Sequence, residues 1–390
     1  MSNYFLNRAK EIYAYIAEKR RHLHKYPELS FQEFKTSEFI QETLADLGIE
    51  YKVIASTGVV AHIGKGKKCV ALRADIDALP IIEETGLDYC STVPGVMHAC
   101  GHDMHSSMLL GAAKMLKEKE KELGGVVKLI FQPGEEKIPG GASILIEEGA
   151  LENPRPEAIF GQHVFPDAPM GTVLLKDGPI MASADELYWT VTGKSSHGAS
   201  PHLGKDPIIA AASLITYLQT AINKFRNPLT PGVISVTSIH GGSATNIFPD
   251  EVKLMGTLRA YDNDWRAEMH KLIENNSAGV CSLYNCDCEV KIEKGYLPVI
   301  NHNETTAFAA KNAEMLLGKE KVKEFEPAMW AEDFAYYQEK IPGTFWFLGV
   351  KPDGAAEMPG LHNSKFNPDE KALIAGSALL AHIAFEFLEK

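Results

Sequence analysis

Two short, almost continuous runs of apolar residues constrain the fold of this chain more than any other feature. They are residues 69–74 (CVALRA) and 126–131 (VVKLIF). Runs of this kind are typical of strands that are buried on both faces, as in the centre of an α/β sheet. Asp75 and Asp77 follow the first run, at the carboxyl end of the predicted strand, which is where open α/β sheets place their active sites.

Helical and strand patterns alternate around these runs over most of the chain. We expect helices at residues 4–23, 36–47, 106–122, 142–149, 303–317, 331–340 and 369–388, and further strands at 50–55, 58–63, 158–164 and 344–349. This alternation predicts an α/β domain with a mixed central sheet flanked by helices.

The pattern changes between residues 184 and 294. The expected order there is strand 186–192, helix 207–224, strands 233–239 and 251–260, helix 264–279 and strand 287–294. This β-α-β-β-α-β order is the ferredoxin-like arrangement, which can close on itself as a compact α+β domain. The chain is therefore predicted to form a discontinuous α/β domain of residues 1–183 and 295–390, interrupted by an inserted domain of residues 184–294.

Charge and composition exclude several classes of protein. A formal net charge of −12 argues against a nucleic-acid partner, which would require a basic face. We find no apolar run long enough to cross a membrane, and charged residues interrupt the N-terminal segment where a signal peptide would need its apolar core. Six cysteines in 390 residues do not form a disulfide framework, so we expect a cytoplasmic protein.

The densest group of potential metal ligands lies in residues 97–105, MHACGHDMH. Thiolate and imidazole are the ligands that borderline metals such as zinc prefer. Cys100 and His102 are two residues apart, so on an extended segment their side chains would point the same way, and Gly101 lets the backbone bend closely around an ion. The alternative is a capping turn that happens to hold histidines, just before a helix expected from residue 106.

Further candidate ligands follow other predicted strands. Glu135 and Glu136 lie on a loop, because proline and glycine end the strand before them, and irregular backbone can direct both carboxylates to one site. The alternative is a surface pair of glutamates. His163 lies in a strand among apolar neighbours, where a histidine is more often a core residue, and His362 lies on a loop after a strand. The arrival of several ligand types at strand ends favours metal binding for both histidines.

Two other groups of histidines and cysteines are interpreted as structural. His22 and His24, at the end of the first helix, are expected on the surface. Cys281, Cys286 and Cys288 could form a second metal site, but they lie at the end of a helix and the start of a strand, where ordinary burial is the better interpretation.

Nine stretches, in order along nearly the whole chain, together resemble one family of metal-dependent amidohydrolases. They are LRADIDALP (72–80), MHACGHDMH (97–105), FQPGEE (131–136), GQHV (161–164), GKSSHGASPH (193–202), NIFPD (246–250), GTLRAYD (256–262), AEDFAYY (331–337) and LHNSKF (361–366). The family includes hippurate hydrolase, bacterial aminoacylases, N-acetyl-diaminopimelate deacetylase and the plant auxin-conjugate hydrolases. Carboxypeptidase G and the succinyl-diaminopimelate desuccinylases are more distant relatives.

The resemblance implies two divalent metal ions per subunit, with zinc as the first candidate and manganese, nickel or cobalt as others. The residues at matching ligand positions are Cys100, His102 and His163 for one ion, and Cys100, Glu136 and His362 for the other. Each ion would keep an open position, and two ions roughly 3.5–4 Å apart can share one water and polarise a substrate carbonyl. His98 and His105 remain alternative ligands.

The resemblance also bears on three acidic residues and implies a role for two of them. Glu135 matches the general base, which takes the proton of the water and passes it to the leaving amine. Asp77 matches a residue that orients a ligand histidine. Asp75 stands where distant relatives have a histidine ligand, a role that His102 takes over here.

Three residues of the inserted domain match groups that contact the substrate. Arg259 and Asn246 would hold its free α-carboxylate, because the guanidinium fork fits a carboxylate; the alternative for Arg259 is a strand-surface arginine. His197 would reach the active site of a partner subunit and polarise the scissile carbonyl, which implies at least a homodimer formed through the inserted domains. The alternative for His197 is an exposed loop histidine.

These implications lead to an expected activity. Residues 1–183 and 295–390 would form the catalytic domain and residues 184–294 a lid and dimerisation domain. The chain would hydrolyse N-acyl-L-amino acids of the N-acetyl or N-benzoyl type to a carboxylate and a free amino acid. The alternatives are a dipeptidase or carboxypeptidase of the same superfamily, N-acetyl-diaminopimelate deacetylase, and a non-catalytic metal-binding or scaffold protein, against which the intact Glu135 counts.

Overall fold

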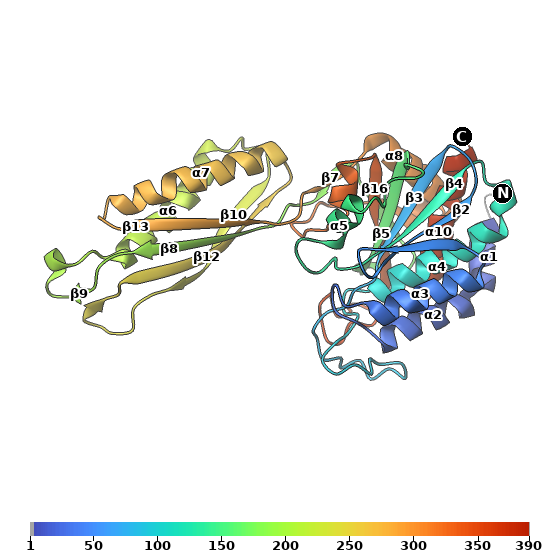
Figure 1. Ribbon diagram of the computed structural model, residues 1–390, viewed down its shortest axis with the longest axis horizontal. Helices are drawn as coiled ribbons and strands as arrows, with labels where there is room; N and C mark the ends of the chain where they lie inside the picture. The colour runs from blue at the N-terminus through green and yellow to red at the C-terminus, as the bar shows by residue number, and fades with distance from the viewer. Residues whose placement is uncertain (1–3, 390) are drawn as a thin grey trace. The chain divides into compact units, whose positions relative to one another are not determined.

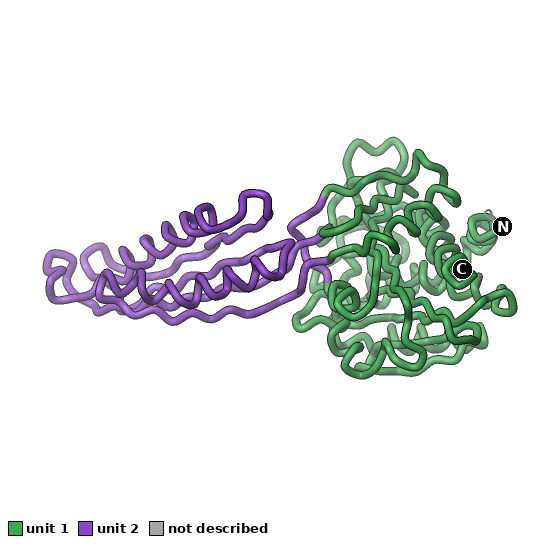
Figure 2. Tube along the Cα trace, turned by 90° about the horizontal axis from the view of Figure 1, so that it is seen from above, with its two compact units in different colours: residues 1–180, 300–326, 333–390 green, residues 181–299, 327–332 purple. Residues whose placement is uncertain are grey.

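A computed structural model describes residues 4–389, which divide into two compact units (Figure 2). Unit 1 comprises the chain up to residue 180, residues 300–326 and the chain from residue 333, and unit 2 comprises residues 181–299 and 327–332. The short segment 327–332 lies outside the predicted insertion. It joins unit 2 because the backbone N–H of Ala182 donates hydrogen bonds to the carbonyl oxygens of Ala328 and Trp330, at 3.2 and 2.8 Å.

Unit 1 is built on an eight-stranded mixed sheet with the order β1-β2-β4-β3-β5-β16-β6-β15 (Figure 1). Its strands are β1 (Glu50–Ile54), β2 (Gly58–Gly64), β3 (Cys69–Asp75), β4 (Val126–Gln132), β5 (Ala158–Pro169), β6 (Val173–Leu175), β15 (Val322–Glu324) and β16 (Gly343–Lys351). Strands β3 and β4 are buried along their whole length, which confirms them as the central strands. Strands β6 and β15 were not predicted, since three residues are too few to show a periodic pattern.

Helices flank this sheet, as predicted. They are α1 (Tyr4–Glu11), α2 (Tyr13–Lys25), α3 (Phe34–Asp46), α4 (His102–Glu118), α5 (Gly141–Glu147), α8 (Asn303–Leu317), α9 (Ala335–Gln338) and α10 (Ala372–Glu389). The predicted helix 331–340 is reduced to α9. The carboxylate of Asp333 accepts hydrogen bonds from the side chain of Gln132 and the backbone N–H of Ala142, and these bonds hold residue 333 at the sheet instead of in a helix.

Helix α10 corrects one expectation from the sequence. By length and composition it could cross a membrane, although no apolar run of that length was expected. In the structure, however, 78% of this helix is buried inside the protein. It packs against α1, α4 and α8, and its apolar residues belong to the same core cluster as those of β3 and β4. A core helix passes the same length and composition test as a membrane span.

The carboxyl ends of four strands of unit 1 lie at one edge of the sheet. Strand β3 pairs in parallel with β4 and β5, and β16 pairs in parallel with β5. Asp75 lies opposite Gln132, and Arg73 lies opposite Gly161, so His163 is level with Asp75 two residues further along. The sheet therefore brings the predicted site residues to one edge, as the strand pattern indicated.

Unit 2 has the predicted ferredoxin-like fold. Its main elements are β8 (Asp185–Thr192), α6 (Pro207–Phe225), β10 (Gly232–His240), β12 (Glu251–Ala260), α7 (Asn263–Ser282) and β13 (Asp287–Lys294). The strands form an antiparallel sheet with the order β10-β12-β8-β13. Buried and exposed residues alternate along β8 and β12, and the buried side chains join a core with those of α6 and α7 (Figure 1). Strands β7 (Gly178–Met181) and β14 (Val299–Asn301) carry the chain between the two units.

Candidate metal centre

Potential metal ligands converge at this sheet edge from four parts of unit 1. Their ligand atoms form two groups in which all lie within 4.8 Å of one another. The groups are Cys100, His102 and His163, and Cys100, Glu136 and His362. The structure thus brings together all five predicted ligands, in the two predicted sets and with Cys100 common to both. Their action as metal ligands stays a prediction.

The turn before α4 determines how Cys100 and His102 converge. Helix α4 begins at His102, not at residue 106, because Gly101 has a left-handed backbone (φ 85°) and its carbonyl accepts the backbone N–H groups of the first helical turn. A Cβ atom at Gly101 would lie only 2.5 Å from Cγ2 of Val164, so this position requires glycine. The two candidate ligand side chains therefore meet across a tight turn, and not along the extended segment considered from the sequence.

Hydrogen bonds orient the two buried histidine rings. His102 Nδ1 donates to the carbonyl oxygen of Asp77 at 2.9 Å and lies 3.2 Å from its carboxylate, while Nε2 is buried without a hydrogen-bond partner. His163 Nδ1 donates to the carbonyl oxygen of Val164 at 2.8 Å, and its Nε2 lies 3.4 Å from Sγ of Cys100. In both rings Nε2 is directed into the site. Asp77 stands where the predicted orienting residue should be.

The second group is completed by the Glu136 carboxylate. Its Oε1 is buried without a hydrogen-bond partner, 3.2 Å from Nε2 of His362 and 3.9 Å from Nε2 of His102. The backbone N–H of His362 donates to the carbonyl oxygen of Ala99 at 2.9 Å, which holds the loop after β16 against the turn before α4. Buried polar atoms without partners are rare in folded proteins. Thiol, imidazole and carboxylate atoms facing one another in this way fit divalent metal ions.

The electrostatics of the site also fit a cation. Burial lowers the pKa of His102, but neighbouring carboxylates outweigh burial and raise the pKa to about 10. These carboxylates belong to Asp75, Asp77 and Glu136. Burial and the charges of Glu136 and Glu135 raise the pKa of the Cys100 thiol well above its ordinary value. A divalent cation would relieve this excess of negative charge and stabilise the thiolate.

Two alternative ligands are less well placed. His105 forms a third group with Asp75 and His102 within 4.8 Å, but both of its ring nitrogens already have partners. Its Nδ1 lies 2.6 Å from the Asp75 carboxylate, and its Nε2 accepts the backbone N–H of Val164 at 2.9 Å. His98 is buried, which lowers its pKa to about 4, and it belongs to no such ligand group within residues 4–389.

Asp75 is occupied by contacts within the protein. Its carboxylate accepts a hydrogen bond from one terminal nitrogen of Arg73 at 2.7 Å, and it also contacts His105. The other terminal nitrogen of Arg73 donates to the carboxylate of Asp333 at 2.8 Å. Burial would raise the pKa of Asp75, but His102, His105 and Arg73 hold it well below its ordinary range. Asp75 therefore carries a negative charge beneath the ligands.

The expected surface position of His24 is wrong. His22 is exposed as expected, but His24 is fully buried, with Nδ1 2.9 Å from the Asp103 carboxylate. Arg20 donates to the same carboxylate at 2.8 Å. Because Asp103 follows His102 in the first turn of α4, this ion network fixes the turn that carries a candidate ligand. The four-residue spacing of Arg20 and His24 on one helix face could have indicated their common partner.

The candidate substrate-contacting residues of unit 2 lie on exposed elements. Short strands β9 (Ser196–His197) and β11 (Ile247–Phe248) pair so that His197 lies opposite Ile247, and the N–H of Gly198 donates to the carbonyl oxygen of Asn246 at 2.7 Å. The structure thus places His197 and Asn246 on adjacent loops. His197 is exposed, and its Nδ1 accepts the N–H of Ala199 at 3.1 Å.

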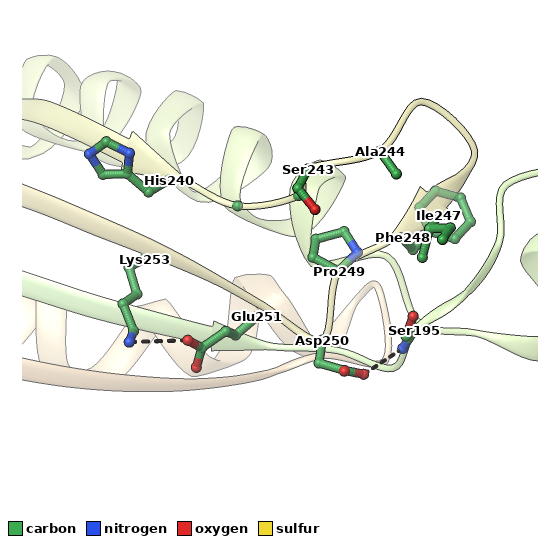
Figure 3. A pocket seen from close by; sticks show the side chains of 12 residues that line it. Ser195, His240, Ser243, Ala244, Ile247, Phe248, Pro249, Asp250, Glu251 and Lys253 are labelled. Atoms are coloured by element: carbon green, nitrogen blue, oxygen red, sulfur yellow. Dashed lines mark hydrogen bonds and ion pairs between the residues drawn. The ribbon is translucent and has the colours of Figure 1, made fainter.

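A pocket of about 480 Å³ is bordered by the same two loops. Figure 3 shows the side chains that line it. The backbone N–H of Ser195 donates to the carboxylate of Asp250 at 2.8 Å and ties the loops together. Arg259 lies apart from the residues lining this pocket, half-buried on β12, and burial lowers its pKa. No carboxylate within residues 4–389 forms an ion pair with it, so its guanidinium is available to an anion.

The cysteines of unit 2 form no metal centre within the described chain. Cys281 and Cys286 are buried in the core that α6 and α7 help to form, and no group of three ligand atoms within 4.8 Å of one another includes them or Cys288. Ordinary burial accounts for Cys281 and Cys286.

Comparison with known proteins agrees with the sequence resemblance. The family model described as "Peptidase family M20/M25/M40" matches residues 71–386. The N-acetyl-L-cysteine deacetylase of Bacillus subtilis is 42% identical over 373 residues, which cover 95% of this chain and 87% of the relative. Thermostable carboxypeptidase 1 of Saccharolobus solfataricus is 39% identical over 390 residues, 98% of each protein.

A solved structure extends the comparison to the fold. The YXEP protein of Bacillus subtilis, described as a dinuclear metal binding peptidase from the M20 family, is 35% identical to this chain. The two structures superpose with a TM-score of 0.85 over 97% of this chain and 99% of the other.

Proposed function

This chain belongs to peptidase family M20/M25/M40, and on that premise we propose that it hydrolyses the amide bond of N-acyl-L-amino acids of the N-acetyl or N-benzoyl type. The products would be a carboxylate and a free amino acid. The observation that carries this proposal is the pair of ligand groups that share Cys100, with Glu135 within 4.8 Å of His102 and Glu136. The identity to a deacetylase of an N-acetyl amino acid supports the substrate class.

Five residues would hold two divalent metal ions, with zinc as the first candidate. They are Cys100, His102 and His163 for one ion, and Cys100, Glu136 and His362 for the other. When bound, two such ions supply Lewis acids for the carbonyl group and lower the pKa of a water molecule. The chain contributes the orientation: Asp77 and the carbonyl of Val164 hold the two rings so that each presents Nε2.

Glu135 would carry the proton. It is 7% exposed, so it is shielded from bulk water yet lies among the ligand groups. Its carboxylate takes one proton from the attacking water as the new C–O bond forms. It then gives this proton to the amide nitrogen as the C–N bond breaks, so that the amine leaves neutral.

Unit 2 would recognise the substrate. Arg259 and Asn246 would bind the free α-carboxylate, and His197 would donate a hydrogen bond to the carbonyl oxygen at the active site of a partner subunit in a homodimer. The exposure of His197 and the lack of a carboxylate partner for Arg259 in the described chain support these roles.

The second candidate function is that of a dipeptidase or carboxypeptidase, which the identity to thermostable carboxypeptidase 1 favours. Turnover of metal-reconstituted protein should be measured on N-acetyl, N-benzoyl and N-succinyl amino acids and on dipeptides with a free amine. We expect the acylated amino acids to be the better substrates. A higher kcat/KM on free dipeptides would reject the aminoacylase proposal in favour of the peptidase.

A further inference from the structure

A buried carboxylate that the proposed chemistry does not use lies against the Glu135 loop. Glu33, at the start of α3, is 0% exposed. Its Oε1 accepts hydrogen bonds from the backbone N–H groups of Gly134 and Phe31, both at 2.8 Å. Its Oε2 accepts one from the hydroxyl of Thr57, also at 2.8 Å. A carboxyl group is costly to bury unless it is bonded in this way, so the bond to Gly134 requires an explanation.

The position of that bond relative to Glu135 suggests one. Gly134 directly precedes Glu135, and Glu136 directly follows it. The backbone N–H of Glu136 donates to the carboxylate of Asp77 at 3.0 Å. Glu33 therefore holds the peptide group between Pro133 and Gly134, one residue before Glu135, and Asp77 holds the peptide group between Glu135 and Glu136.

Packing restricts the same loop from a third direction. Gly134 has a left-handed backbone (φ 61°), and a Cβ atom there would lie 2.3 Å from the ring of Phe31. The loop is therefore in direct contact with that ring. Ser30, one residue earlier, donates its hydroxyl to the Asp77 carboxylate at 2.7 Å. The segment before α3 thus contacts both carboxylate anchors of the loop.

We propose that Glu33 is a positioning residue for Glu135, because the hydrogen bond that it accepts from the Gly134 N–H fixes the loop so that the Glu135 carboxylate points into the candidate metal centre. The inference rests on the proposed role of Glu135 as the base. Removing the anchor should misplace the base without removing a metal ligand. A misplacement of about 1 Å costs on the order of 100-fold in rate.

A neutral variant of the same shape tests whether the loop requires the hydrogen bond or the charge of Glu33. Burial and the nearby charge of Asp77 raise the pKa of Glu33 to about 7, so a neutral side chain of the same shape is compatible with this position. Glutamine keeps one oxygen as the acceptor for the Gly134 N–H. Alanine removes the acceptor, and aspartate withdraws it by one methylene group. These three substitutions separate the hydrogen bond from the charge.

The first experiment compares Glu33→Ala, Glu33→Gln and a control variant at a more exposed glutamate. Glu148→Ala removes another carboxylate of unit 1 that accepts a backbone N–H, that of Ala55 at 2.7 Å, outside the metal centre. We expect Glu33→Ala to lower kcat roughly 10–100-fold with unchanged KM and metal content, and Glu33→Gln to recover most of that loss. Glu148→Ala should leave kcat unchanged. If the alanine variant does not fold, Glu33→Asp should show the same fall in kcat.

Four results of this experiment would overturn the proposal. Three of them are normal kcat in the folded variant that lacks the anchor, loss of metal together with activity, and an equal fall in kcat in Glu148→Ala. Failure of the Glu33→Gln variant to recover activity would also reject it, because the same hydrogen bond would then be present without effect.

A double-mutant cycle separates this inference from the function on which it rests. If Glu33 acts through Glu135, adding Glu33→Ala to Glu135→Gln should lower kcat little further, whereas independent effects would multiply. If the losses in kcat of the two single variants multiply in the double variant, the positioning role of Glu33 is rejected and Glu135 remains the candidate base. Near-normal turnover of Glu135→Gln alone rejects the base, and the inference about Glu33 with it.

Discussion

The candidate metal centre of unit 1 and the candidate recognition residues of unit 2 differ in how firmly their side chains are held. In unit 1, His102 and His163 are buried, and the nitrogen that points away from the site is hydrogen-bonded in each. In unit 2, His197 is exposed and Arg259 has no carboxylate partner in the described chain. Unit 1 therefore holds its candidate ligands in place in advance, whereas the exposed ring of His197 and the guanidinium of Arg259 are left open to a ligand.

The largest difference should appear when a buried cysteine of each unit is removed. Cys100→Ala removes a ligand common to both groups, so it should lose at least one metal ion and nearly all activity. Cys281→Ala removes a buried thiol of unit 2 and should leave metal content unchanged. Elemental analysis and turnover of both purified variants measure the contrast. Two ions retained in the Cys100 variant would mean that the bridging position is wrong.

The second test removes the candidate general base of unit 1 and leaves every candidate metal ligand in place. Glu135→Gln should keep both metal ions and lose roughly 10²–10⁴-fold in kcat, because a positioned proton-transfer group contributes about that much. The measurement is kcat together with metal content. Full occupancy with near-normal turnover would contradict the assignment of the base.

The third test concerns the exposed histidine of unit 2. His197→Ala should cost a few kcal/mol of transition-state stabilisation. His197→Ala and Glu135→Ala proteins should each be nearly inactive, and activity should return when the two are mixed and exchange subunits. Exchange is followed by mass difference or by labels on the two proteins. Exchange without recovered activity would show that His197 does not act across a subunit interface.

The fourth test asks whether Arg259 acts by its charge. Arg259→Met should lower kcat/KM roughly 10–100-fold on N-acetyl amino acids, since a hydrogen bond between charged groups contributes about 1.5–3 kcal/mol. On the same substrates with the carboxylate blocked as an amide, the variant and the wild type should be equal. An equal loss on both substrates would indicate a structural arginine instead.

The smallest expected effect is the pH dependence of the free energy of unfolding that the buried Glu33 carboxyl group causes. Its pKa is raised from 4.5 to about 7 on folding, so its contribution to stability is full below pH 4.5 and is lost as the pH rises through 7. Relative to Glu33→Gln, the wild type should therefore lose about 1–3 kcal/mol of unfolding free energy over that range. Denaturant unfolding of chelator-treated protein at several pH values measures this. A difference independent of pH would contradict the raised pKa.

Much of the fold could be predicted because it depends on local patterns. The apolar runs of β3 and β4 identified the centre of the sheet, and the order of elements from 184 to 294 identified the ferredoxin-like unit. Three-residue strands and the start of α4 could not be predicted in this way. The start of α4 depends on the left-handed turn at Gly101. The backbone there lies close to Val164, a residue on a strand that is distant in sequence.

The candidate site was predictable only in part for a related reason. Spacing within residues 97–105 indicated a metal site, but the sharing of Cys100 between two groups followed from the family resemblance and not from spacing. The contact between Glu33 and Gly134 joins residues 101 positions apart, and no periodic pattern records it. The burial of His24 was missed because its partner Asp103 lies on another helix.

The divided course of unit 1 along the chain has a consequence for biosynthesis. Strand β5 lies between β3 and β16 in the sheet, but β16 emerges from the ribosome only after residues 181–299 of unit 2 have been made. During that interval β5 presents an open, apolar edge, which is a hazard for aggregation, while unit 2 can already fold. Nascent chains that stop between residues 333 and 342 should therefore depend on chaperones, although residues 181–299 and 327–332 of unit 2 have already been made.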